Sequence, residues 1–228
     1  ASGMNPDYAA DVAAAGASCV VWEPHGGEKQ MFTFASTTPP PFKVYIDAGH
    51  GWNSSQYGVF DPGAVGLYRE ADMTSDLASQ IADRCEGMGI AAVTNAYATL
   101  STGVPYRKRQ ADAISLDCTT LVSIHFNSGG GSGVESYIHT YNAATGSPTL
   151  QSIMHKYMVA GTGLSDRGQG RMELAVCGGK LPAVLLEVGF INNFYDMDAY
   201  LSNKNRVVSF LAAGIKEASQ KPVCNAYR

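Results

Sequence analysis

The sequence predicts an α/β fold: a mostly parallel, twisted sheet with helices on both faces, preceded by a short hairpin-like arm. Three apolar runs, at residues 43–47, 121–127 and 183–190, are rich in β-branched and aromatic residues and are typical of buried strands. Amphipathic helical patterns lie between them, for example at residues 70–86. Strands that alternate with such helices predict an α/β sandwich around a mostly parallel sheet.

Composition bounds the class of protein and its partners. The 228 residues suffice for one domain with a sizeable core and an appendage. The net charge of −4 and the pI near 5.7 argue against nucleic acid or an anionic membrane as a partner. No apolar run approaches the roughly 20 residues of a spanning helix, so no membrane insertion is expected. Residues 1–17 lack a basic head followed by an apolar stretch, so we expect synthesis in the cytoplasm without a signal peptide.

Residues 1–42 form the first predicted domain, an N-terminal arm with a proline-rich linker. Two short strands are expected at residues 19–22 and 30–34, joined as a hairpin. The run Pro39-Pro-Pro41 predicts a stiff, extended connection. A lone two-stranded hairpin is marginally stable in water, so we expect the arm to pack on the rest of the same chain.

Residues 43–220 form the second predicted domain, a catalytic domain, and residues 221–228 a C-terminal tail. The helix at residues 70–86 has one apolar face, made of Leu77, Ala78, Ile81, Ala82 and Cys85. The glycine-rich stretch at residues 52–69 predicts a long functional loop. Further strands are expected at residues 90–94, 134–139 and 174–176, and the last strand, which includes the apolar run at 183–190, is expected to begin at residue 181. Further helices are expected at residues 105–116, from Ser147 onward, and at residues 205–220.

Three polar side chains stand where elements of this fold begin or end. His50 follows a strand and lies between two glycines, and His125 ends another strand, so both fall where ligands bind in open parallel sheets. Glu70 opens a helix after the long loop, a position that also favours a carboxylate simply because of the helix dipole. Two histidines, one carboxylate and an open position make a catalytic zinc site with water as the fourth ligand. The sequence therefore makes His50, Glu70 and His125 candidate zinc ligands.

Glu187 stands inside an otherwise apolar strand. A buried carboxylate without a partner costs several kcal/mol, so Glu187 should be paired, hydrogen-bonded or facing a polar site. A base that takes a proton from a zinc-bound water would sit in such a place, with its pKa raised by apolar neighbours.

The five cysteines, at positions 19, 85, 118, 177 and 224, are odd in number and contain no Cys-x-x-Cys pair, which argues against a disulfide framework. We interpret Cys85 and Cys118 as small buried side chains in a chain made in a reducing compartment. Two alternatives to a zinc enzyme remain. One is a cysteine peptidase that uses Cys118 or Cys177 with a histidine, although neither stands next to a plausible base. The other is a non-catalytic binding module with structural zinc.

The sequence resembles the zinc-dependent N-acetylmuramoyl-L-alanine amidases of bacteria and phages, of the amidase 3 type. The resemblance covers residues 43–218, with departures at Ala71, Asn95 and Asp112 that do not touch the predicted metal ligands. Its motifs are Ile46-Asp-Ala-Gly-His-Gly51, Asp61-Pro-Gly-Ala-x-Gly66, Glu70, Arg107 with Ala111-Asp112, Ser123-Ile-His-Phe-Asn127, Gly133-x-Glu-Ser-Tyr137, Asp166-Arg-Gly168 and Pro182-Ala-Val-Leu-Leu-Glu-Val-Gly-Phe-Ile-x-Asn193.

The resemblance implies one zinc ion per chain, held by His50, Glu70 and His125, and Glu187 as the catalytic glutamate. The implied reaction is hydrolysis of the amide between the lactyl group of N-acetylmuramic acid and L-alanine of the peptidoglycan stem peptide. Asn127 is a candidate for substrate binding, with a strand-end cap as the alternative. We expect a monomer that acts at the bacterial cell wall, and we favour a phage endolysin or an injected lytic enzyme.

Overall fold

The computed structural model describes residues 19–22, 30–33, 41–99 and 102–225. The chain divides into two compact units, residues 1–39 and 40–228. In the first unit, β1 (Cys19–Trp22) pairs antiparallel with β2 (Gln30–Thr33), as expected for the arm. The segment that connects these strands and most of the proline linker lie outside the described residues, so the docking of the arm stays a prediction.

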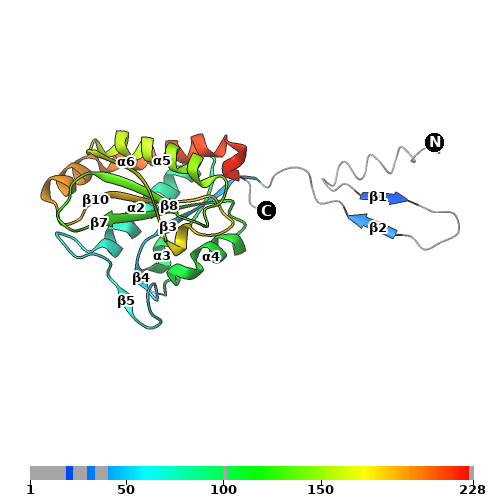
Figure 1. Cartoon of the computed structure of the whole chain (residues 1–228), viewed down its shortest axis with the longest axis horizontal. Coiled ribbons are helices and arrows are strands. Elements are labelled where there is room, and N and C mark those ends of the chain that lie inside the picture. Colours follow the sequence, from blue (N-terminus) through cyan, green and yellow to red (C-terminus); the bar gives the residue numbers. More distant parts are fainter. Residues whose placement is uncertain (1–18, 23–29, 34–40, 100–101, 226–228) are drawn as a thin grey trace. The chain divides into compact units, whose positions relative to one another are not determined.

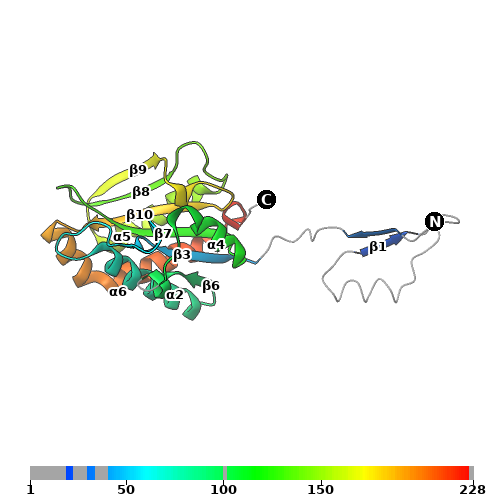
Figure 2. The same ribbon diagram turned by 90° about the horizontal axis from the view of Figure 1, so that it is seen from below.

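A six-stranded sheet with the order β6-β3-β7-β10-β8-β9 forms the second unit, and Figure 2 shows its strands side by side. The neighbouring pairs β6–β3, β3–β7, β7–β10 and β8–β9 are parallel, whereas β8 runs antiparallel to β10. The predicted mostly parallel sheet is therefore confirmed. The strands are β3 (Lys43–Ala48), β6 (Ala91–Thr94), β7 (Thr120–Asn127), β8 (Val134–His139), β9 (Asp166–Met172) and β10 (Ala183–Phe190).

Helices cover both faces of this sheet, as the sequence predicts. Figure 1 shows α5 (Ser147–Thr162) and α6 (Phe194–Ser219) on one side and α4 (Arg109–Ser115) on the other. The larger core packs α2 (Glu70–Gly87), α5 and α6 against one face, through side chains such as Leu77, Met154 and Leu211. A smaller core, which includes Tyr45 and Leu185, lies on the other face.

Several predicted elements differ from the structure. Residues 174–176 are not a strand, because Ala175–Cys177 forms the 3-10 helix η2. The expected helix at residues 105–116 is split into the 3-10 helix η1 (Tyr106–Lys108) and α4, and a short α3 (Ala96–Thr99) precedes it. The closing helix begins at Phe194 rather than near 205, and it is followed by the 3-10 helix η3 (Pro222–Asn225).

The long loop before α2 carries a small sheet of its own, in which β4 (Gly51–Trp52) pairs antiparallel with β5 (Phe60–Asp61). Trp52 and Phe60 pack edge to face with their ring centroids 5.7 Å apart. The loop is also hydrogen-bonded to the helix it precedes, because the backbone N–H groups of Glu70 and Ala71 donate to Ala64 O and Pro62 O. In this way the loop fixes the start of α2.

Side-chain alternation along β10 decides which of its residues face the site. Val184 and Leu186 belong to the larger core, whereas Leu185, which stands between them, belongs to the smaller one. Because successive side chains of a strand point to opposite faces, Glu187 lies on the face of Leu185. Within the described part of the chain, no helix has the length and apolarity needed to cross a membrane.

Candidate metal centre

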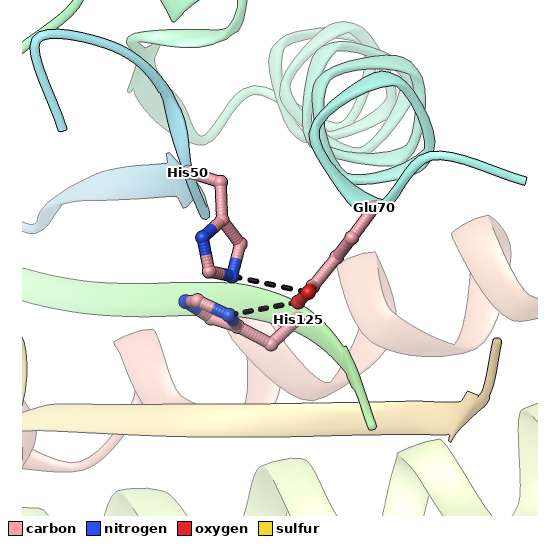
Figure 3. Close-up of side chains that lie close together, drawn as sticks. All are labelled: His50, Glu70 and His125. Carbon is pink, nitrogen blue, oxygen red and sulfur yellow. Dashed lines mark hydrogen bonds and ion pairs between the residues drawn. The ribbon is translucent and has the colours of Figure 1, made fainter. Parts of the chain in front are cut away.

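Three side chains from different elements meet at the carboxyl ends of the parallel strands. His50 follows β3, Glu70 is the first residue of α2, and His125 lies near the end of β7. One ligand atom from each lies within 4.8 Å of the others. Figure 3 shows the two imidazole rings and the carboxylate converging on one point, so the structure brings together all three predicted ligands.

The carboxylate of Glu70 bridges the two histidines. His50 Nε2 lies 3.1 Å from Glu70 Oε2, and His125 Nδ1 lies 3.0 Å from Glu70 Oε1. The carboxylate is held in place by the chain as well, since it accepts hydrogen bonds from the backbone N–H groups of Ala64 and Phe126, at 2.8 and 3.0 Å. Asp61 fixes the other ring nitrogen of His50, with Nδ1 and Oδ2 3.2 Å apart. A carboxylate behind a ligating histidine sets the tautomer and the ring orientation.

Two glycines leave the space that these side chains fill. A Cβ added to Gly49 would overlap the His125 ring. A Cβ added to Gly63 would come within 2.6 Å of both Glu70 Oε2 and the His50 ring, and Gly63 also has a φ of +67°. Any larger residue at either position would therefore displace a predicted ligand.

The protonation of this cluster follows from its internal pairing. Burial opposes the charged form of Glu70, but hydrogen bonds from His125 and His50 lower its pKa well below the usual range. Burial also opposes protonation of His50, yet Glu70 and Asp61 together raise the pKa of this histidine. Burial likewise opposes the charge of Asp61, but hydrogen bonds from Gly63 N and His50 lower its pKa. A cation at this point would therefore compete with a proton on His50 for the ionised carboxylate of Glu70.

The donor set fits zinc. Two imidazole nitrogens and one carboxylate oxygen, with one position left for water or substrate, are the ligands of catalytic zinc sites. The chain's own contacts bring the three ligand atoms together, and the glycines around them leave room for the side chains.

Glu187 lies beside this cluster. In the parallel pairing of β10 with β7, Glu187 is in register with His125, so the two side chains leave the same face of the sheet on adjacent strands. Its Oε2 atom is buried and has no hydrogen-bond partner among the described residues. Burial, followed by the charges of Glu70 and Glu135, raises the pKa of Glu187 to about 8. A carboxylate in this condition is suited to accept and return a proton near neutral pH.

Comparison with known proteins places this arrangement in a family. Residues 44–217 match the family described as N-acetylmuramoyl-L-alanine amidase, of the amidase 3 type. The chain belongs to this family. The sporulation-specific N-acetylmuramoyl-L-alanine amidase of Bacillus subtilis strain 168 is 30% identical over 177 residues, which cover 74% of this chain and 62% of that protein. This chain thus spans less than two thirds of the length of that relative.

Solved structures of the amidase family share the fold. The catalytic domain of CwlV, an N-acetylmuramoyl-L-alanine amidase from Bacillus (Paenibacillus) polymyxa var. colistinus, is 31% identical with a TM-score of 0.66. That match covers 77% of this chain and 97% of the CwlV domain. An N-acetylmuramoyl-L-alanine amidase from Clostridium difficile 630 is 25% identical with a TM-score of 0.65, over 78% of this chain and 94% of the other.

Asn127, the candidate substrate-binding residue, is the last residue of β7 and follows His125 along that strand. Its side-chain amide donates to Glu135 on β8, and its side-chain oxygen accepts from Ser128 N at 2.7 Å. Both ends of the amide are therefore engaged, and contact with substrate stays a prediction for this residue.

Sequence reasoning missed the buried ion pair that lies behind the candidate metal centre. Arg109 donates from Nη1 to both carboxylate oxygens of Asp47, at 2.9 and 3.0 Å, and the two side chains are 2% and 0% exposed. Its Nη2 donates to the backbone oxygen of His50 at 2.8 Å. That contact holds His50 in a left-handed conformation, with φ of 65°. The sequence did contain a signal for this pair, because Asp47 is an acidic residue in an otherwise apolar strand.

The cysteines do not supply a nucleophile in the described part of the chain. Cys85, Cys118, Cys177 and Cys224 are free and buried. Burial raises the pKa of the Cys118 thiol to about 11 and raises the pKa of the Cys177 thiol further. Because the thiolate is the reactive form, neither of the two candidate cysteines has the environment of a catalytic thiol.

The raised pKa of Glu187 has a consequence for the metal-free protein. A carboxyl whose pKa is about 8 when folded, against 4.5 for an unperturbed glutamate, keeps its proton in the native state while the unfolded chain loses it. Stability therefore falls as pH rises between these two values.

We expect the melting temperature of the metal-free protein to drop more between pH 5 and pH 9 than that of metal-free Glu187→Gln. The exposed Glu173→Gln serves as the control and should follow the wild type. Identical pH profiles for wild type and Glu187→Gln would contradict the burial of a protonated Glu187.

Proposed function

We propose that this protein hydrolyses the amide bond between the lactyl group of N-acetylmuramic acid and L-alanine of the peptidoglycan stem peptide. Family membership supports the reaction class. The observation that carries the proposal is the orphaned carboxylate of Glu187 in register with His125, beside a cluster of two histidines and one glutamate. A zinc ion bound by His50, Glu70 and His125 would lower the pKa of its water from about 15.7 to about 7 and polarise the scissile carbonyl.

In this proposal Glu187 does the proton transfer. Its carboxylate accepts the proton of the attacking water, and its burial favours the protonated form that results. The same group then gives that proton to the nitrogen of L-alanine, so that the C–N bond breaks and a free amine leaves. Asp61 orients His50 through Nδ1, and Glu70 is fixed by backbone N–H groups, so the ligands need no rearrangement during the reaction.

A pocket beside the two histidines offers room for the substrate. Its volume is about 300 Å³, and its walls include Leu174, Val176 and Leu185 together with Tyr106 and Glu173. Apolar walls with a few polar groups are typical of ligand sites. We propose that the muramoyl part of the substrate enters this pocket.

The test of the reaction is mass spectrometry of digested peptidoglycan. We expect a new amino terminus on L-alanine and a newly freed lactyl carboxylate on the sugar, and we expect chelation to stop the digestion. Digestion that continues without metal would support a thiol peptidase, and zinc-loaded protein that binds walls but releases nothing would support a binding module.

The metal itself is a separate prediction. We expect one zinc per chain in the purified protein. We expect His125→Ala to lose this zinc, because the two ligands that remain would hold it only weakly. Elemental analysis measures the content, and X-ray absorption should show nitrogen ligands at about 2.0–2.1 Å. His139→Ala, a histidine on β8 outside the cluster, should keep its zinc. Equal zinc content in the wild type and His125→Ala would overturn the assignment.

We further propose that the protein acts on the bacterial cell wall as a lytic enzyme, such as a phage endolysin, and works as a monomer. Added to intact bacterial walls, the purified protein should then clear their turbidity. Cleavage of soluble muropeptides without clearing of walls would speak for a remodelling role, and a dimer in light scattering would contradict the monomer.

A further inference from the structure

Arg167 contacts Glu135, which lies in register with the proposed catalytic residue Glu187. Arg167 lies at the start of β9, the strand at the edge of the sheet next to β8. Its Nε lies 3.4 Å from Glu135 Oε2, and its Nη1 donates to the backbone oxygen of Ser132 at 3.5 Å. The guanidinium also stacks over the ring of Phe190, with Cζ 4.9 Å from the ring centroid.

Glu135, the partner of Arg167, lies in the same row across the sheet as the proposed site residues. Glu135 on β8 is in register with Glu187 on β10, which is in register with His125 on β7. Neighbouring strands lie about 4.8 Å apart, so Glu135 stands one strand spacing from the base and two from the metal ligand. The guanidinium that Glu135 holds is therefore within roughly 5–10 Å of Glu187.

The donor groups of Arg167 are not used up by these contacts. An arginine has five N–H donors in a planar fork. Among the described residues, the acceptors for Arg167 are Glu135 and Ser132 O, and the side chain is 40% exposed. Glu135 is 14% exposed and receives a second hydrogen bond, from the Asn127 amide. Glu135 thus anchors the guanidinium and leaves part of its fork open to a further acceptor.

An open guanidinium fork binds carboxylates in a bidentate way. On the amine side of the scissile bond, the stem peptide continues from L-alanine to a D-glutamate that is linked through its side chain and so keeps a free α-carboxylate. Consecutive Cα atoms are 3.8 Å apart, which puts that carboxylate roughly 5–7 Å from the scissile nitrogen. This distance falls within the roughly 5–10 Å that strand spacing allows between Glu187 and the guanidinium.

The pocket beside the two histidines is poorly suited to a carboxylate. Its lining includes the acidic side chains of Asp61 and Glu173. The guanidinium of Arg109, which also lines it, is already bonded to Asp47 and His50 O. The charges therefore favour a neutral sugar in that pocket and the peptide near Arg167.

We propose that Arg167, oriented by Glu135, binds the α-carboxylate of the second stem residue and makes the enzyme prefer stems with a free carboxylate over amidated ones. The inference rests on the proposed amidase function. It assigns Arg167 to substrate recognition and Glu135 to the positioning of Arg167.

The test uses two muramoyl tripeptides that end in lysine amide and differ only in the second residue, which carries an α-carboxylate in one and an α-carboxamide in the other. For the zinc-loaded wild type we expect kcat/KM to be about ten- to a hundredfold higher with the carboxylate, the range for a hydrogen-bonded charged group. Arg167→Gln should lose this preference while retaining most of its activity on the carboxamide. Arg167→Lys should keep part of the preference, because it keeps the charge without the fork.

Arg171→Gln is the matched control, since Arg171 lies on the same strand but in register with Ile138, a residue of the larger core. It should keep the wild-type preference. A wild type that cleaves both substrates equally, or an Arg167→Gln variant that slows both by the same factor, would overturn the role of Arg167 while leaving the amidase function intact. A wild type that cleaves neither substrate would overturn the amidase function and this inference with it.

Discussion

Replacing Glu187 by glutamine should lower kcat roughly 10²- to 10⁴-fold, the usual contribution of a positioned acid–base group. Glutamine keeps the size of the side chain but cannot accept a proton from water or return one to the leaving amine. Because the buried Oε2 has no hydrogen-bond partner among the described residues, the amide should be accommodated without unfolding the strand. Steady-state hydrolysis of a soluble muropeptide by the zinc-loaded variant measures the effect.

Zinc content and melting temperature should be measured on the same Glu187→Gln sample, so that lost activity is not mistaken for lost metal. Glu217→Gln is the control, because Glu217 is paired with Lys156 between α5 and α6 and lies outside the candidate site. It should retain wild-type activity. A Glu187→Gln variant that turns over within tenfold of the wild type, with zinc bound, would show that another group moves the proton.

Replacing Arg109 by methionine should destabilise the fold by about 3–5 kcal/mol, the cost of leaving one member of a buried ion pair unpaired. Asp47 would keep its hydrogen bonds from Ser123 and Asn95 but would lose its counter-charge in the interior. The backbone oxygen of His50 would lose its donor too, so zinc affinity should fall with stability. Urea unfolding monitored by circular dichroism measures the change.

Arg84→Met tests whether any lost arginine would have this effect. Arg84 lies on α2 and its hydrogen bond to Ser209 is exposed, so its removal should change stability by at most about 1 kcal/mol. The double variant Arg109→Met with Asp47→Asn should recover part of the loss, because it removes the uncompensated charge. A loss below about 1 kcal/mol for Arg109→Met alone would mean that water or another cation compensates Asp47.

The sequence is most informative where one strong local pattern coincides with the tertiary environment. The strands that carry His125 and Glu187 are continuous apolar runs, and the structure has them at Thr120–Asn127 and Ala183–Phe190. The helix that presents Glu70 begins at the predicted residue. All three predicted metal ligands could therefore be placed in advance, because each is attached to the end of an element with clear periodicity.

Elements held by tertiary contacts gave no such pattern. Residues 166–172, Asp-Arg-Gly-Gln-Gly-Arg-Met, contain little apolar surface, and they form β9 only because the edge of β8 offers a partner. The run at 174–176 is apolar enough for a strand, but it closes the smaller core as part of a 3-10 turn. The early start of α6 did have a signal, since the Asn193 side chain accepts from the N–H groups of Tyr195 and Asp196. The interaction between Asp47 and Arg109 spans 62 residues, and no local rule links them.

The backbone of His50 shows what this site demands of the rest of the molecule. A residue with a side chain is held in the left-handed region at a cost of roughly 1–2 kcal/mol, which glycine would avoid. If selection acted on stability alone, position 50 would be occupied by glycine, like positions 49 and 51 on either side of it. A histidine at this position therefore costs stability, and the hydrogen bond from Arg109 to the backbone oxygen of His50 offsets part of that cost. In the proposed metal site, position 50 is thus a local trade-off between activity and stability.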